Sequence, residues 1–100
     1  MKLVWSPLAL SRVEEIVEYI GSHRPGAARD WVVGLFENVR TLATFPKRGR
    51  VVREVGRPDI REILYERHRV IYKLEATRVA VLTVRHGRRL LDFSELQIKP

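Results

Sequence analysis

The sequence predicts an α+β fold in which a small, mostly antiparallel β-sheet packs against an amino-terminal helical hairpin. Two observations carry this prediction. Apolar residues recur at helical spacing in the first half of the chain, and three strand-like segments with short connections follow in the second half. The length of 100 residues suits one domain, and 45% hydrophobic residues suffice for one modest core. We therefore expect a single domain that spans residues 1–100.

The first half of the chain predicts one short strand and two helices. Lys2–Trp5 is an apolar strand candidate, and the Ser6–Pro7 pair is a typical helix start, because Ser can cap a helix and Pro suits its first turn. Gly21 is expected to end this helix. Pro25 opens the second helix and Pro46 stops it, since proline lacks the N–H that continues a helix. The apolar positions in both recur at helical spacing: Val13, Ile16, Val17 and Ile20, then Ala28, Trp31, Val32, Leu35, Phe36, Val39 and Leu42. Helices joined by so few residues form an antiparallel hairpin, and Trp5 is expected to pack beneath it.

The second half predicts three strands that pair antiparallel. Residues 47–59 form a basic loop that is punctuated by glycine and proline. The strand candidates are rich in β-branched, aromatic and other apolar residues: Ile60–Tyr65, Arg69–Leu74 and Val79–Val84. Glu75–Arg78 is expected to be a turn, and such short connections imply antiparallel pairing. The tail, residues 90–100, is compatible with a short helix or an edge strand.

The charge of the chain indicates an anionic partner. The formal net charge is +7, and 15 of the 19 basic residues are Arg, whose planar fork binds phosphate or carboxylate through two hydrogen bonds. The cations expected to bind nucleic acid or an acidic protein segment lie in the loop, along the predicted strands and just after them: Lys47, Arg48, Arg50, Arg67, Arg69, Arg88 and Arg89. The alternative is a solvated, charge-rich surface of the kind that thermophilic proteins carry.

The residues present exclude or disfavour several classes of site. The chain has no Cys, which excludes disulfides, thiolate metal sites and a cysteine nucleophile. Phosphate-loop, dinucleotide and zinc-protease motifs are missing, and no carboxylate cluster surrounds His23, His68 or His86, so we expect neither a metal nor a cofactor. His68 is expected to be a solvated turn residue. No apolar run reaches the ~20 residues of a membrane span, and the amino-terminal apolar stretch breaks at Pro7. We expect a cytoplasmic protein without a signal peptide or a membrane partner.

Two possibilities remain, namely general acid–base catalysis on a phosphodiester and binding without chemistry. Cleavage needs a base, cations for the developing negative charge and an acid for the leaving oxygen. The candidate catalytic residues are Arg61, Arg85 and His86, since histidine titrates near neutral pH. Glu62 or Glu66 is an alternative base. The competing interpretation makes His86 an ordinary residue at the end of a strand.

Short motifs in a fixed order give the chain a resemblance to a known family. They are the opening VWSPLAL, the helical EEIVEYI followed by RPGAA, then TFPKRGR, REILYERHRVIYKLE and the closing VAVLTVRHGRR. In this order, over almost the full length, they resemble the RelE/ParE superfamily, the toxins of bacterial type II toxin–antitoxin modules. The resemblance implies a mostly antiparallel sheet with two amino-terminal helices. It also implies a cytoplasmic protein and a cognate antitoxin whose extended, acidic segment wraps the basic surface.

The superfamily divides by target, so the resemblance implies two alternatives. RelE-like members cut mRNA on the ribosome, and Arg61, Arg85 and His86 match positions of their basic or histidine residues. ParE-like members poison DNA gyrase and are not enzymes. This chain has no Tyr after Tyr72 and no Lys in Ile60–Tyr65, where many RelE-like nucleases carry them, and its VRHGRR segment resembles ParE-like sequences.

Two further functions fit the composition. One is a non-toxic basic binding module, a decayed toxin that binds an acidic antitoxin and takes part in transcriptional autoregulation. The other is a general nucleic-acid binder, whose affinity would fall steeply as the salt concentration rises.

Overall fold

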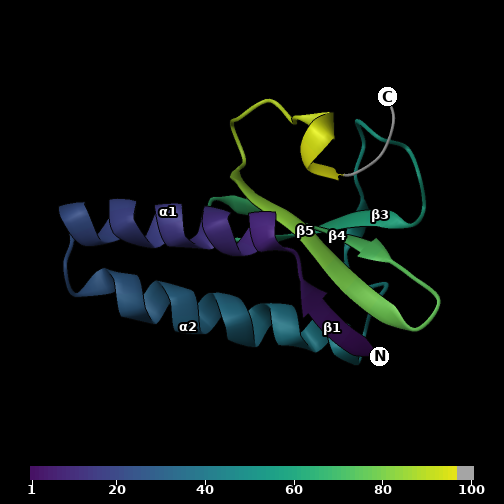
Figure 1. Cartoon of the computed structure of the whole chain (residues 1–100), viewed down its shortest axis with the longest axis horizontal. Helices are drawn as coiled ribbons and strands as arrows, with labels where there is room; N and C mark the ends of the chain where they lie inside the picture. The colour runs from purple at the N-terminus through teal and green to yellow at the C-terminus, as the bar shows by residue number, and fades with distance from the viewer. Residues whose placement is uncertain (97–100) are drawn as a thin grey trace.

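Two helices cover one face of a five-stranded sheet in the computed structural model, which describes residues 1–96 (Figure 1). In chain order the elements are β1 (Lys2–Trp5), α1 (Pro7–His23), α2 (Ala27–Arg40), the 3₁₀ helix η1 (Thr41–Ala43), β2 (Arg50–Val51), β3 (Ile60–Tyr65), β4 (His68–Leu74), β5 (Arg78–His86) and the 3₁₀ helix η2 (Phe93–Leu96). The helices α1 and α2 form a hairpin whose tip extends beyond the sheet (Figure 1). The predicted α+β class is confirmed.

Local sequence explains the start of α1 but not its end. The Ser6 hydroxyl accepts the N–H of Ala9 at 3.0 Å and donates to the carbonyl of Leu82 at 2.8 Å, so one side chain caps α1 and fixes it to β5. The predicted end at Gly21 is wrong, because α1 continues to His23. Glycine inside a helix costs only about 1 kcal/mol, and tertiary packing outweighs that cost. Within residues 1–96 no helix has the length and apolarity to cross a membrane.

The strand order is β1-β5-β4-β3-β2, so β1 and β2 are the edges of the sheet. The strands β3, β4 and β5 pair antiparallel as their short connections predicted, whereas β1 pairs parallel with β5. Leu82 is an extra residue on β5, since Ile71 pairs with Thr83 while Tyr72 pairs with Val81. The strand β2 lies inside the segment predicted as a loop, because two residues are too few to give a periodic signal.

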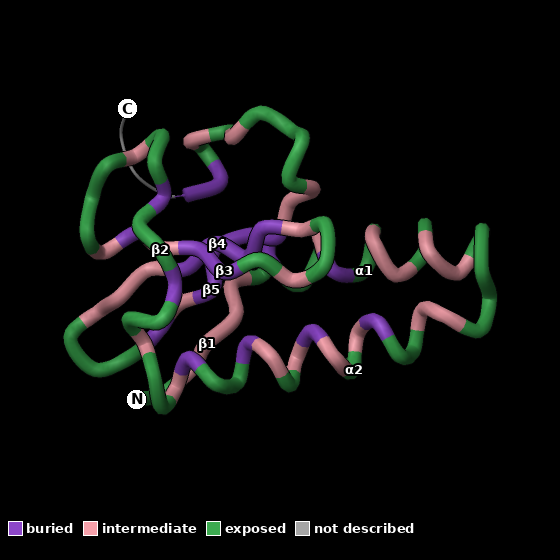
Figure 2. Tube along the Cα trace, turned by 180° about the vertical axis from the view of Figure 1, so that it is seen from behind, coloured by how far each residue is buried: buried purple, intermediate pink, exposed green. Residues whose placement is uncertain are grey.

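The face of the sheet toward the helices carries the larger core. Leu35 and Val39 of α2 are fully buried in one cluster with Val70 and Val81 of the sheet. Figure 2 shows buried residues along the sheet and on the inner sides of the helices, with exposed residues on the outer sides. The Trp5 ring lies 4.7 Å from the ring of Phe36, centroid to centroid, and this confirms that Trp5 packs beneath the hairpin.

The opposite face, which α1 and α2 leave uncovered, is called the open face here. It carries a smaller cluster, whose buried members are Val52, Ile60, Ile71, Leu82 and Leu96. Leu96 belongs to η2, so the tail closes this cluster. The tail therefore forms a 3₁₀ helix rather than an edge strand, and residues 97–100 lie outside the described part of the chain.

Candidate functional site

A groove with a volume of about 900 Å³ lies on the open face. Its lining comes from the β2 region, from β3 and β4 and from the end of β5: Arg50, Val51, Arg53, Glu54, Glu62, Leu64, Glu66, Arg67, Arg69, His86, Gly87 and Arg88. We call it the open-face groove. Four of the predicted anion-binding residues are brought together there, namely Arg50, Arg67, Arg69 and Arg88.

Two of these arginines are paired with carboxylates of the chain itself. Arg69 donates to Glu62, and its two terminal nitrogens donate to Glu54 at 2.8 and 3.0 Å. Arg50 lies opposite Glu62 in the β2–β3 pair and donates to it at 2.9 Å. Glu62 is only 2% exposed, and a carboxylate buried so deeply needs paired cations.

This pairing changes what Glu62 and Arg69 can do. The hydrogen bonds to Glu54 and Glu62 raise the pKa of the Arg69 guanidinium, and the bond from Arg69 lowers the pKa of the Glu54 carboxyl. Arg69 is a buried ion-pair partner, so the interpretation as a solvated cation on the sheet surface is wrong for this residue. Glu62 is held between two cations and out of solvent, which conflicts with a role as general base.

Arg85 forms a second buried ion pair, with the tail. It lies directly opposite Arg69 across the β4–β5 pair and contacts Glu95 of η2. Glu95 is 5% exposed and also accepts the Nε–H of Arg12 at 2.8 Å and the hydroxyl of Thr83 at 3.2 Å. Like charges opposite each other in a sheet are destabilising unless carboxylates compensate them. Sequence reasoning missed Glu95, because the structure of the tail was left open.

Arg61 does not line the open-face groove, and its guanidinium instead donates hydrogen bonds to backbone carbonyls. It projects to the helix side of the sheet, as Ile63 does, and its guanidinium donates to the carbonyls of Gly49 and Pro58, each at 2.9 Å. The loop that it holds is tightly packed, because a Cβ at Gly49 would lie 2.6 Å from the carbonyl oxygen of Glu62. Arg61 therefore fixes the loop before β2.

His86 and His68 face each other, a contact that sequence reasoning missed. They pair across β4 and β5, with ring centroids 5.4 Å apart, and the His68 ring lies 5.3 Å from that of Trp31. The predicted solvated turn at His68 is wrong, because Glu66, with φ of 52°, and Arg67 complete the turn, so that His68 begins β4. Burial, and then the proximity of His86, lower the pKa of the His68 imidazole, and Glu66 opposes this shift. The Nδ1 atom of His68 has no hydrogen-bond partner within residues 1–96.

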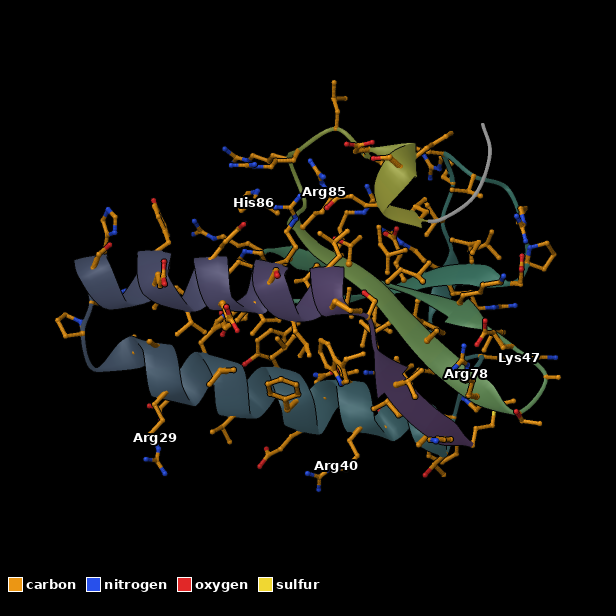
Figure 3. All side chains as sticks on the ribbon, viewed as in Figure 1. Arg29, Arg40, Lys47, Arg78, Arg85 and His86 are labelled. Atoms are coloured by element: carbon orange, nitrogen blue, oxygen red, sulfur yellow. The ribbon has the colours of Figure 1, made fainter. Side chains whose placement is uncertain are left out.

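The other predicted anion-binding residues lie outside the open-face groove. Arg48 is bonded to Asn38 and Thr41 at the end of α2. Figure 3 shows Lys47 well away from Arg85 and His86. Arg89 is exposed in the segment after β5. In the described residues no group of three or more His, Cys, Asp or Glu could hold a metal ion.

Comparison with known proteins identifies the family. A family model described as the ParE toxin of the parDE type II toxin–antitoxin system matches residues 3–91. A solved structure described as the chromosomal ParDE toxin–antitoxin system from P. aeruginosa has a similar fold, with a TM-score of 0.74 and 19% sequence identity; the match covers 86% of this chain and 95% of that chain. Among curated proteins nothing matches the chain. The resemblance drawn from the sequence motifs is thus confirmed, and the chain belongs to the ParE toxin family of type II toxin–antitoxin systems.

Proposed function

We propose that this protein is a type II toxin that acts in the cytoplasm by binding DNA gyrase, and that a cognate antitoxin neutralises it. Family membership and the ParDE description of the structural relative support the antitoxin as a partner. One observation carries the choice of gyrase over mRNA, namely that the candidate catalytic residues do not share a site.

The separation of these residues follows from the register of the sheet. Arg85 and His86 are neighbours in β5, so their side chains leave opposite faces. Arg61 pairs with Tyr72 of β4, whereas His86 pairs with His68, so their positions differ by about 13 Å along the strands at about 3.3 Å per residue. Phosphodiester cleavage needs its base, acid and cations within hydrogen-bond reach of one phosphate. This arrangement favours a binding function over that chemistry.

The cations that remain available support binding to an acidic protein surface. Arg53, Arg67 and Arg88 line the open-face groove, are exposed and form no ion pair with residues 1–96. Leu64 lies among them and is 56% exposed, so the groove also presents an apolar side chain. An exposed apolar side chain beside a cationic rim fits an acidic segment with an apolar anchor, and the charge speeds the encounter with it.

The test compares two activities of the purified full chain. We expect it to inhibit DNA supercoiling by gyrase and to leave mRNA intact in cell-free translation that is mapped by primer extension. The triple variant Arg53→Glu, Arg67→Glu and Arg88→Glu should lose gyrase inhibition. The control makes the same charge change on exposed residues of the hairpin (Arg24→Glu, Arg29→Glu and Arg40→Glu) and should keep it. Ribosome-dependent cuts together with normal supercoiling would reject the proposal.

A ribonuclease is the second candidate, favoured by the contact between His68 and His86 beside the cationic rim. Two imidazoles in one site can serve as base and acid, provided that one is neutral and the other protonated. The lowered pKa of His68 favours its neutral form at neutral pH. If mRNA is cut, we expect His68→Gln and His86→Gln each to abolish the cuts while the chain stays folded.

A further inference from the structure

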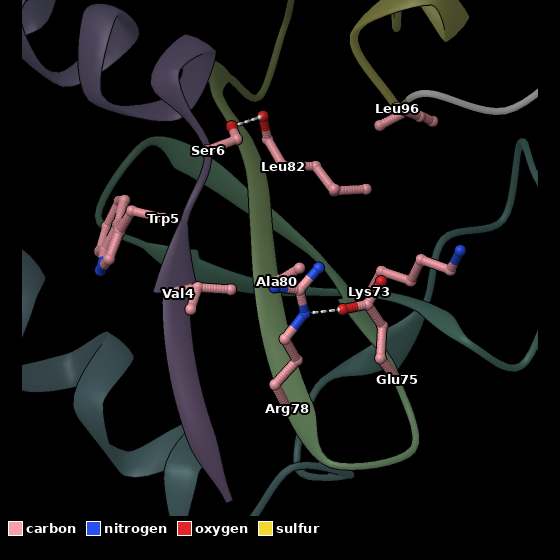
Figure 4. A pocket seen from close by; sticks show the side chains of 9 residues that line it. All are labelled: Val4, Trp5, Ser6, Lys73, Glu75, Arg78, Ala80, Leu82 and Leu96. Atoms are coloured by element: carbon pink, nitrogen blue, oxygen red, sulfur yellow. Dashed lines mark hydrogen bonds and ion pairs between the residues drawn. The ribbon is translucent and has the colours of Figure 1, made fainter.

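A second concavity lies on the open face beside β1 (Figure 4). It is a pocket of about 230 Å³, and it shares none of its lining residues with the open-face groove. Polar surface predominates in its lining, which combines three charged side chains with an apolar wall that includes Val4, Ala80 and Leu82. Pockets for drug-sized ligands measure about 300–1,000 Å³, so this pocket suits a smaller and polar molecule.

Arg78 presents a free hydrogen-bonding edge to this pocket. Figure 4 shows its guanidinium over Ala80, between Val4 on one side and Lys73 on the other. Its Nε–H donates to the Glu75 carboxylate, whereas neither terminal nitrogen has a hydrogen-bond partner within residues 1–96. The two terminal nitrogens can therefore donate parallel hydrogen bonds to one oxyanion, which is the geometry that arginine offers to phosphate and carboxylate groups.

The charges around the pocket indicate a doubly charged anion. Lys73 lines the pocket, and Lys2 lies on the same face of the sheet as Arg78, because the two are aligned in the β1–β5 pair. Neither lysine forms an ion pair within the described residues, and Glu75 is the one carboxylate of the described lining. Three cations and one carboxylate leave a charge of +2. A phosphate monoester matches this charge, because it is a dianion above its second pKa of about 6.

We propose that this pocket binds the phosphate group of a small phosphate monoester. The free edge of Arg78 donates to two phosphate oxygens, the ammonium of Lys73 neutralises further charge, and the organic group of the ester lies against Val4 and Leu82. The backbone of a nucleic acid fits less well, because each of its phosphodiesters carries a single charge. The site is independent of the target of the toxin, since none of its residues lines the open-face groove.

The experiment titrates the full chain with phenyl phosphate at about pH 7.5, where the probe is a dianion, and at constant ionic strength. We expect saturable shifts of the backbone amides of Ala80 and Leu82 in NMR spectra, and none at Leu64 in the open-face groove. Arg78→Gln should weaken binding at least about tenfold, because it removes both the fork and its charge. The control is Arg29→Gln, which makes the same charge change on the hairpin, far from Arg78 in Figure 3, and should alter affinity less than about twofold.

Two further variants distinguish a specific site from a loss of folding. Arg78→Lys keeps the charge but loses the planar fork, and should weaken binding about threefold to tenfold. Glu75→Gln removes the opposing charge and should tighten binding about twofold to fivefold. A damaged fold cannot produce this gain of affinity.

Three results would overturn the proposal. One is unchanged affinity for phenyl phosphate in Arg78→Gln, or weaker binding in Glu75→Gln. Another is equal affinity of the unmodified chain for dimethyl phosphate, which carries a single charge. The third is a single-stranded oligonucleotide without a terminal phosphate that shifts the same amides and binds more tightly than phenyl phosphate, because it would identify the nucleic-acid backbone as the source of the phosphate.

Discussion

The two faces of the sheet are stabilised in different ways. The helix side is closed by α1 and α2 over a broad apolar cluster that includes Leu35, Val39 and Tyr72. The open face has a small apolar cluster closed by Leu96, and beside it lie buried ion pairs around the carboxylates of Glu62 and Glu95. The helix side is therefore stabilised by the burial of apolar surface. The open face depends on ion pairs, because a buried carboxylate without a paired cation would be strongly destabilising.

This difference shows how a strongly basic protein can place arginines side by side on the open face without destabilising it. Arg69 and Arg85 lie side by side there, and each is paired with a carboxylate of another element, Glu62 of β3 for one and Glu95 of η2 for the other. Glu62 and Glu95 neutralise these two central cations, whereas Arg53, Arg67 and Arg88 at the rim of the open-face groove stay exposed. The same surface thus combines a stabilising centre with an exposed cationic periphery.

The largest expected effect compares one leucine from each apolar cluster. Leu35→Ala leaves a cavity between α2 and the sheet and should lower the free energy of unfolding by about 3–5 kcal/mol. Leu96→Ala should cost about 2–3 kcal/mol, because η2 lies at the margin of the fold and the tail can relax around the cavity. Urea unfolding of both variants makes the comparison. If Leu96→Ala costs as much as Leu35→Ala, the open-face cluster stabilises the fold as strongly as the core beneath the helices, which contradicts the comparison.

An effect of intermediate size tests the buried ion pairs. Glu62→Gln keeps the shape of the side chain but removes the charge that Arg50 and Arg69 share, so we expect a loss of about 2–4 kcal/mol. The control is Glu75→Gln, which breaks an exposed pair with Arg78 and should cost about 0–1 kcal/mol. Thermal unfolding at low and high salt measures both. Equal losses would mean that the open-face ion pairs contribute no more than surface pairs.

The smallest effect is a dependence of stability on pH that originates at His68. Because the pKa of His68 is lower in the folded protein than its ordinary value of about 6.5, the unfolded chain takes up the proton first as the pH falls. The free energy of unfolding should therefore decline as the pH falls through about 6.5, until the folded imidazole is also protonated. His68→Gln should flatten this decline between about pH 7 and pH 5. His23→Gln, at the exposed tip of the hairpin, is the control, and a flatter curve for His23→Gln alone would contradict the assignment.

Most of the fold was predictable from local sequence signals. The exceptions share one cause, namely that tertiary contacts define those elements. The capping pair Ser6–Pro7 predicts the start of α1. The pattern of apolar residues predicts the strands β3, β4 and β5. The predicted end of α1 at Gly21 was wrong, because the packing of the hairpin outweighs the free-energy cost of a glycine within a helix. The strand β2 and the 3₁₀ helix η2 are too short for a periodic pattern, and only their contacts with β3 and with the open face define them.

The candidate site was less predictable, because it depends on pairing across strands. The sequence placed Arg85 and His86 side by side, but the extended backbone of β5 separates their side chains onto opposite faces. It placed His68 in a turn, whereas the register brings it against His86. The candidate catalytic role of Arg61, Arg85 and His86 stays a prediction, and the register favours a binding function over it.

By itself, the sequence determined the helical hairpin, the antiparallel strands, the basic charge and, through its motifs, the toxin family, because each of these depends on residue type and local order. The tertiary structure alone decided which arginines remain available to a partner. Glu62 neutralises Arg69 from the neighbouring strand, and Glu95 reaches Arg85 only because η2 folds back onto the open face. Such pairs depend on the three-dimensional path of the chain, since the attraction between charges falls off with distance in space, whatever their separation in sequence.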